Sequence, residues 1–142
     1  MGYIYYNPNP ENKDDIDCTI RAISKVEDIS WDEAYMWVCI EGAIIHRMPP
    51  GNKVWSSFIE NRGYKYVPLK DRCPDCYTVD DFCYDHPYGR YILAVLVNYI
   101  KNFTTMDSGK NVISNHVVAV VNGNYYDAWD SGSEVVTAYW YK

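Results

Sequence analysis

Three side chains of this sequence have the types that nucleophilic attack on an acyl group requires: Cys18, His116 and Asp127. A cysteine attacks a carbonyl carbon as its thiolate, a histidine takes up and returns the proton, and a carboxylate orients the imidazole. The three lie far apart in the chain, and such groups meet in space rather than in sequence. Whether they form a site therefore depends on the elements that carry them.

His116 opens a candidate β-hairpin. An apolar run, 117–121, is followed by Asn122-Gly123 and then by Tyr125-Tyr126. Asn-Gly between two β-prone runs favours a two-residue type I′ turn, because that turn needs positive φ at both positions. The sequence therefore predicts adjacent antiparallel strands, the first of which begins at the histidine.

The register of this hairpin decides which aspartate can reach His116. With a two-residue turn, Val118 lies opposite Asp127, which places His116 and Asp127 on one face as diagonal neighbours about 7–8 Å apart. Asp130 then points to the other face. A turn longer or shorter by one residue would exchange the two aspartates.

Cys18 lies where a helix is expected to begin. Isoleucines recur at helical spacing and predict a helix from about Cys18 to Val26, with Asp17 as its N-cap (Ile16, Ile20 and Ile23). A thiol in the first turn of a helix is favoured as thiolate by the positive end of the helix dipole. The alternative is a small buried residue, since free cysteines are usually part of a core. A His–Asp pair elsewhere in the chain favours the reactive role.

Composition bounds the remaining possibilities. With 142 residues, of which 48% are hydrophobic, the chain is expected to be a single domain spanning 1–142. A net charge of −6 argues against nucleic acid as a partner. We expect no membrane span, because no run of 18 apolar residues occurs, and no cofactor. The five cysteines, without an export signal, favour a reducing, cytoplasmic location.

The remaining patterns predict an α+β scaffold. Ser30 and Glu33 form a capping-box pattern for a helix that ends near Glu41-Gly42, and Asn52 is placed to cap a second helix that stops at Gly63. Strands are expected at 64–67, 90–97 and 134–141, with 90–97 central in the sheet and 101–114 a loop. We expect helices first and then an antiparallel sheet, with the cysteine helix on the face that presents His116.

A rival chemistry lies between residues 73 and 86. Cys73, Cys76, Cys83 and His86 are spaced C-x2-C-x6-C-x2-H, and Thr78 can cap a short helix over 79–85. Four such ligands can bind zinc tetrahedrally, which would make the chain a zinc-stapled binding module. The interval between the two pairs is short, so we expect no stoichiometric zinc and assign no metal ligand.

The order of these motifs resembles that of papain-like cysteine peptidases. A cysteine begins a helix, a histidine opens a strand, and Asp127-Ala128-Trp129 is similar to the Asn-Ser-Trp of papain-type enzymes. The Asp17-Cys18 pair also resembles the peptidase domains of bacteriocin exporters. A wider pattern is similar to small papain-like proteins of bacteria and phages: Asp17-Cys18-x-x-Arg21-Ala22, then Phe82 and His86-Pro87-x-Gly89-x-Tyr91-Ile92-Leu93, then His116-Val-Val-Ala-Val, then Gly123-x-Tyr125-Tyr126-Asp127-x-Trp129-Asp130.

This resemblance implies a papain-like fold and hydrolysis of a peptide or isopeptide bond through a thioester. It implies that Cys18 attacks, that His116 moves the proton and that Asp127 orients the imidazole. Asn12 stands where these enzymes have their oxyanion-hole Gln, six residues before the cysteine, although its side chain is one methylene shorter. A peptide or protein is the expected substrate. Two alternatives stay open: an acyl or amine transferase with the same triad, and a non-catalytic binding protein on the same fold.

Overall fold

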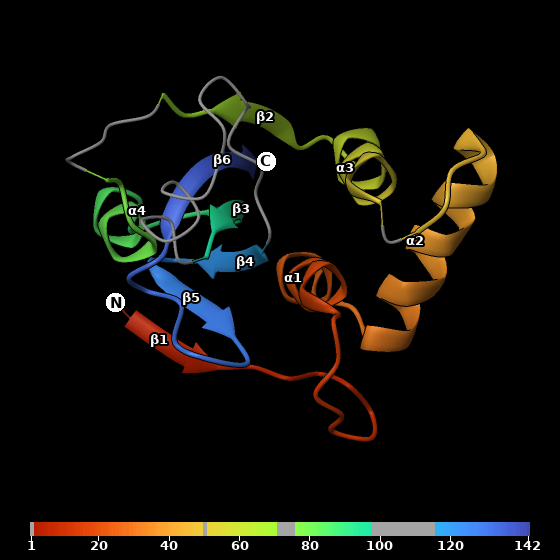
Figure 1. The fold of residues 1–142 in the computed structure, drawn as a ribbon, viewed down its shortest axis with the longest axis horizontal. Helices are drawn as coiled ribbons and strands as arrows, with labels where there is room; N and C mark the ends of the chain where they lie inside the picture. The colour runs from red at the N-terminus through yellow and green to blue at the C-terminus, as the bar shows by residue number, and fades with distance from the viewer. Residues whose placement is uncertain (1, 50, 71–75, 98–115) are drawn as a thin grey trace, which may run out of the picture.

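Four helices stand against one six-stranded sheet in the computed structural model, which describes residues 2–49, 51–70, 76–97 and 116–142 (Figure 1). The α+β class is confirmed. The helices are α1 (Cys18–Glu27), α2 (Trp31–Ile45), α3 (Asn52–Asn61) and α4 (Val79–Asp85). The strands are β1 (Gly2–Tyr5), β2 (Lys65–Pro68), β3 (Arg90–Leu96), β4 (His116–Val121), β5 (Asn124–Asp127) and β6 (Val135–Tyr141). None of these helices is long and apolar enough to cross a membrane.

The sheet is mixed, so the prediction of an antiparallel sheet is wrong at one edge. Its strand order is β1-β5-β4-β3-β6-β2, and β1 pairs with β5 in parallel while the other neighbours are antiparallel. The sequence pattern gave no expectation of a strand at Gly2–Tyr5. Four half-exposed residues carry no alternation, and what holds them is the open edge of β5, more than a hundred residues away.

Two hydrophobic clusters lie on the two faces of the sheet. Ile92 and Ala94 of β3 belong to the cluster beneath α1, α2 and α3, whereas Leu93 and Val95 belong to the cluster beneath α4. Figure 1 shows the first three helices on one side and α4 on the other. Because both faces of β3 are covered, its run is almost wholly apolar, and its predicted central position is confirmed.

Helix boundaries follow the expectations with two corrections. The predicted end of α2 near Gly42 is wrong by about one turn, since the helix continues to Ile45. Gly42 is explained by packing instead: a Cβ there would lie 2.8 Å from the Arg47 carbonyl oxygen. Asn52 is the first residue of α3 rather than its cap, and its Oδ1 accepts from Trp55 Nε1 at 3.0 Å. The predicted cap at Thr78 is confirmed as a full capping box on α4.

The packing of α1 also corrects an expectation. The helix lies on the face that carries Val117 and Ala119, whereas His116 shares the alternation of Val118 and Val120, which face α4. The cysteine helix therefore does not cover the face to which His116 belongs. Its first turn meets His116 at the end of the sheet, where β4 begins and β5 finishes, and there the Cys18 sulfur interacts with the His116 side chain.

Candidate active site

The hairpin has the predicted register. Val121 pairs with Asn124 and Ala119 with Tyr126, and the two turn residues, Asn122 and Gly123, have φ of 50° and 78°. Positive φ at both positions is the type I′ turn that the Asn-Gly pair predicts. This register brings the end of β5 beside the start of β4.

His116 and Asp127 form a buried pair. His116 Nε2–H donates to Asp127 Oδ2 at 2.6 Å, and the two residues are 8% and 1% exposed. The indole of Trp129 lies over the imidazole with ring centroids 5.0 Å apart, which shields the pair from water. Asp130 turns away and accepts a hydrogen bond from the Tyr125 hydroxyl. With Nε2 engaged, Nδ1 is the nitrogen left to face a reacting group.

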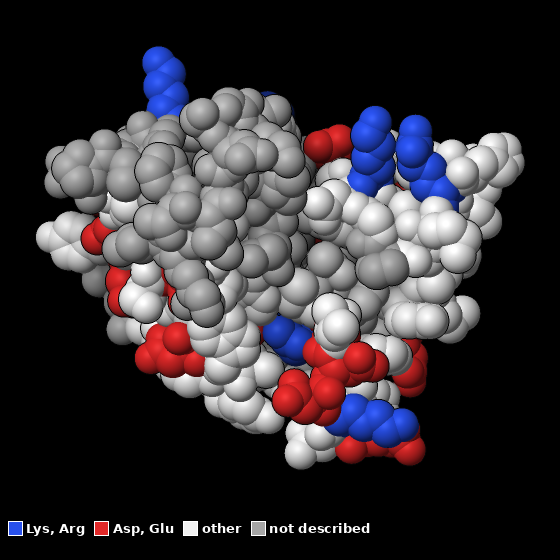
Figure 2. Space-filling model, viewed as in Figure 1, with Lys and Arg blue, Asp and Glu red and all other residues white. Residues whose placement is uncertain are grey.

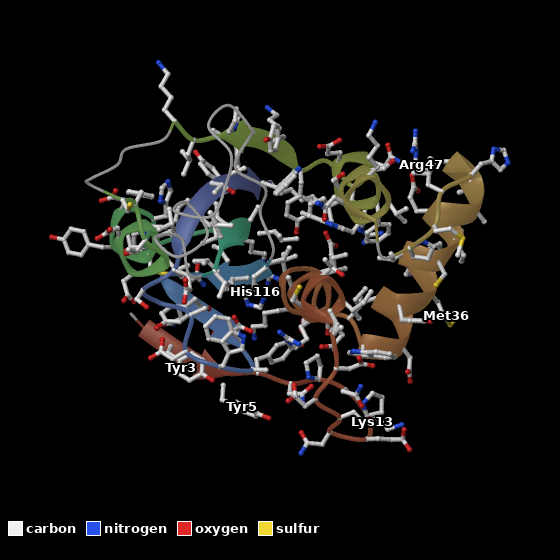
Figure 3. The ribbon with its side chains drawn as sticks, in the orientation of Figure 1. Tyr3, Tyr5, Lys13, Met36, Arg47 and His116 are labelled. Carbon is white, nitrogen blue, oxygen red and sulfur yellow. The ribbon has the colours of Figure 1, made fainter. Side chains whose placement is uncertain are left out.

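Cys18 occupies the first position of α1 and faces this imidazole. Its sulfur interacts with the His116 side chain and with the backbone N–H of Val117. Figure 3 shows His116 reaching from the sheet toward the start of α1. The first N–H groups of a helix have no partner within the helix, so the thiol sits among unpaired donors. The structure thus brings Cys18, His116 and Asp127 together.

The carboxylate of Asp127 is held by more than the histidine. Its Oδ2 also accepts from Ser131 Oγ at 2.7 Å, while its Oδ1 accepts from the Ala128 N–H at 2.8 Å and from Arg21 Nη2 at 3.0 Å. A carboxylate that accepts several hydrogen bonds stays ionised and loses its rotational freedom. Asp127 therefore presents a fixed negative charge to the imidazole.

Arg21 links this carboxylate to α1, a role that the sequence motif containing it did not predict. Its guanidinium bridges Asp127 and Asp17, and Asp17 also accepts from Trp31 Nε1 at 2.8 Å. Asp17 stands at the N-cap position of α1, but its side chain makes no capping bond because the arginine and the tryptophan occupy it. One signal was available in the sequence: Arg21 lies between the apolar Ile20 and Ile23 of the predicted helix. An arginine buried at such a position, as the structure shows it to be, needs anionic partners.

The three groups favour an ion pair between sulfur and imidazole. Burial alone would raise the pKa of the Cys18 thiol, but the hydrogen bond and charge of His116, the Val117 N–H and Arg21 together lower it. Burial would lower the pKa of His116, but Asp127 and Cys18 raise it to about 9. Burial would raise the pKa of Asp127, but His116, Ser131 and Ala128 lower it. Each shift favours the charged form.

A cleft opens beside the sulfur. Cys18 and His116 contribute to its lining, and one wall is aromatic because Trp140 packs against Trp55 and Tyr66 with ring centroids 4.8 Å and 4.9 Å away. Small side chains at the cleft, Ala94 and Ala138, come from the neighbouring strands β3 and β6, and their size leaves room in front of that wall. The site is therefore open to a substrate on the side of the thiol and closed by Trp129 on the side of the carboxylate.

Asn12 does not join this group. It lies in an exposed loop with φ of 52°, and its Oδ1 accepts from Asn7 Nδ2 at 3.4 Å. It is not among the residues that line the cleft, whereas Asn52 is. No contact in the described part of the chain supports an oxyanion role for Asn12.

The candidate zinc ligands are only partly described, because Cys73 lies outside the described residues. Cys83 is buried, and burial beside Asp80 raises its pKa to about 12, which disfavours the thiolate that a metal needs. His86 stacks on Phe82 with centroids 3.9 Å apart, and its Nδ1 bonds the Phe82 carbonyl oxygen. Within the ranges described, no three His, Cys, Asp or Glu residues are grouped as a metal site.

Comparisons with known proteins gave no match to a family model, a curated protein or a solved structure. The papain-like assignment stays a prediction.

Proposed function

We propose that this chain is a cysteine hydrolase of the papain-like type, acting on a peptide or isopeptide bond. The observation that carries the proposal is the unbroken chain of contacts from Cys18 through His116 to Asp127, which ends at an open cleft on the sulfur side. A buried structural cysteine needs neither an imidazolium partner nor access to a cleft.

In the proposed mechanism the Cys18 thiolate attacks the carbonyl carbon and forms a tetrahedral oxyanion. The backbone N–H of Cys18, in the first turn of α1, is directed at that oxyanion. Imidazolium His116 then gives its proton to the leaving amine, and the C–N bond breaks to leave a thioester on the sulfur. Neutral His116 next takes a proton from water, which attacks the thioester and restores the thiolate.

The cleft supports a peptide with an apolar side chain beside the scissile bond. The indoles of Trp55 and Trp140 bury large areas against such a side chain, and aromatic walls of this kind favour apolar ligands over charged ones. The loop before α1 is acidic: Asp14 and Asp15 are exposed and directly precede Ile16, which lines the cleft. Lys13 is paired to Glu11 at 2.8 Å, and Figure 2 shows acidic side chains gathered at the lower edge of the molecule. An acidic approach disfavours an acidic peptide.

A peptidyl vinyl sulfone with an aromatic residue at its reactive end tests the proposal. We expect stoichiometric labelling of Cys18 at neutral pH, and its loss in Cys18→Ala and in His116→Ala. The matched control is Cys39→Ala, which removes a cysteine of α2 and is expected to label normally. Failure of the folded protein to react at Cys18, or equal labelling of His116→Ala, contradicts a catalytic triad and favours the non-catalytic binding protein.

The transferase alternative uses the same thioester, and it differs from the hydrolase in the group that accepts the acyl chain: an amine instead of water. A peptide ester is incubated with the protein, with and without an added primary amine. A hydrolase releases the acid in both reactions, whereas a transferase forms the amide at the expense of the acid. No contact in the described residues favours an amine acceptor over water.

A further inference from the structure

A second pocket lies beside the start of α1, on the side of the other helices. Figure 1 shows the start of α1 between the sheet on one side and α2 and α3 on the other. Among the described residues, the lining of this pocket comes from the loop before α1, from α1, α2 and α3, and from the segment that joins the last two, and no strand contributes to it. We call it the helical pocket (Asp15, Ile20, Trp31, Tyr35, Val38 and Pro49).

The helical pocket adjoins the cleft beside the sulfur. Ile16, Thr19 and Trp55 line both hollows, and Thr19 directly follows Cys18 in the chain. Ile16 is 94% exposed although it is apolar, so a peptide that lies across this shared wall would cover it. An extended chain advances about 3.3 Å per residue, which lets a peptide held in the cleft place a side chain in the helical pocket from within about three residues of the scissile bond.

Two stacked aromatic rings form one wall of the helical pocket. Trp31 and Tyr35 lie one turn apart on α2, with ring centroids 5.2 Å apart and planes inclined by 13°. The indole is held in place because its N–H donates to Asp17 Oδ2 at 2.8 Å, whereas Tyr35 is 50% exposed. A planar guanidinium stacks on aromatic faces and is attracted by their π electrons. The wall therefore suits a planar cation as well as an apolar side chain.

The charge of the lining favours the cation. Two carboxylates line the helical pocket, and no lysine or arginine of the described chain does. Asp17 is neutralised by its buried ion pair with Arg21. Asp15 is exposed and belongs to none of the ion pairs between described residues, and its Oδ1 accepts a local bond from the Ile16 N–H at 2.7 Å. The pocket thus carries one uncompensated negative charge, which complements a positively charged side chain.

We propose that the helical pocket binds an arginine side chain of the substrate, with its guanidinium against the Tyr35 ring and beside the Asp15 carboxylate. The inference rests on the proposed function, because it concerns the peptide that the thiolate attacks. It narrows the substrate class to peptides with an apolar residue in the cleft and an arginine within about three residues of the scissile bond. Asp15 and Tyr35 determine specificity and take no part in the contacts among Cys18, His116 and Asp127.

Cleavage of internally quenched peptides tests the proposal. Each peptide keeps an aromatic residue beside the scissile bond and carries arginine at one of the three positions on either side. Its partner carries citrulline there, which has nearly the same shape without the charge, and mass spectrometry checks that the same bond is cut. At one position we expect kcat/KM to be about five- to tenfold higher with arginine, mostly through a lower KM.

Two kinds of failure are distinguishable in this assay. If the protein cleaves the peptides but arginine and citrulline give equal kcat/KM at every position, the proposed function stands and the helical pocket is not an arginine site. If none of the peptides is cleaved, the proposed function is contradicted, and the inference is overturned with it.

Substitutions at the pocket test the roles of Asp15 and Tyr35. In Asp15→Asn and in Tyr35→Leu the arginine-to-citrulline ratio should fall to about twofold or less, because the charge or the ring is gone. Both side chains are exposed, so neither change is expected to unfold the chain. Asp14→Asn is the matched control: it removes the same charge from the neighbouring exposed residue, which does not line the pocket. We expect this control to keep the native ratio.

Charge reversal at Asp15 provides a gain of specificity. With Asp15→Lys, glutamate should be preferred over glutamine at the position where the native chain prefers arginine, since the lining then carries the opposite sign. An arginine preference that persists in Asp15→Asn, or that is lost equally in Asp14→Asn, shows that the helical pocket does not hold the guanidinium and overturns the proposal.

Discussion

Replacing Arg21 by Met tests the bridge between α1 and the hairpin. The guanidinium of Arg21 is 7% exposed and contacts Asp17 and Asp127, whose side chains are 7% and 1% exposed. Methionine fills most of the same volume without the charge. The variant therefore leaves two buried carboxylates facing each other without the cation that compensates them.

The size of the effect follows from burial. Removing one partner from a buried ion pair costs about 3–5 kcal/mol, because the remaining charge stays desolvated. Lys13→Met is the control: Lys13 pairs with Glu11 at 2.8 Å, and their side chains are 64% and 72% exposed. An ion pair so exposed contributes only about 0–1 kcal/mol, so we expect a clear difference between the two variants.

Urea unfolding followed by circular dichroism measures both free energies. The free energy of unfolding of a typical domain is about 5–15 kcal/mol, so a loss of this size is measurable in a folded variant. Arg21→Lys provides a second variant, because it keeps the charge but cannot bridge both carboxylates in the same way, and we expect an intermediate loss. If Arg21→Met is no less stable than Lys13→Met, the bridge does not contribute as its burial indicates.

Three further outcomes are expected. With limiting iodoacetamide at neutral pH, Cys18 should react before Cys83, whose raised pKa keeps it a thiol; mass-spectrometric mapping checks this, and preferential labelling of Cys83 would contradict it. Turnover should fall as the pH rises through about 9, because His116 then loses the proton that the leaving amine needs. The raised pKa of His116 also stabilises the fold: this contribution is complete below about pH 6.5 and should be lost as the pH rises through about 9, as urea titrations at several pH values would show. Asp127→Ala should slow vinyl sulfone labelling of Cys18 strongly, toward the roughly 10⁴-fold known for triads in general, and Asp127→Asn should slow it less. Asp130→Ala should leave the labelling rate within a few-fold. Slow labelling of Asp130→Ala together with normal labelling of Asp127→Ala would refute the register.

The hairpin was predictable because its information is local. Asn122-Gly123 fixes the turn and strand alternation fixes the face, so the proximity of His116 and Asp127 follows from a window of about fifteen residues. The beginnings of α1 and α4 were predictable for the same reason. The capping and dipole patterns that mark them are contained in single turns of sequence.

The features that the sequence did not reveal depend on contacts between distant segments. β1 is a strand because β5 offers a free edge, and the role of Arg21 depends on a carboxylate 106 positions away. Asn12 was assigned from a position relative to Cys18, and the loop conformation that turns it to solvent is set by its own local hydrogen bonds. In the sequence alone, the local patterns around these residues do not indicate the distant segments that they contact.

The span of the Arg21–Asp127 contact has a consequence for the order of events during synthesis. Cys18 emerges from the ribosome roughly a hundred residues before the hairpin, which at about 5–20 residues per second amounts to many seconds. Throughout that interval two of the groups that lower its pKa, His116 and the Val117 N–H, do not yet exist. The nascent chain therefore carries an ordinary thiol, and the reactive thiolate appears only when the C-terminal hairpin docks on α1. A chain that stalls before residue 116 lacks the imidazole that activates Cys18, so the nucleophile gains its raised reactivity only after the last part of the fold has formed.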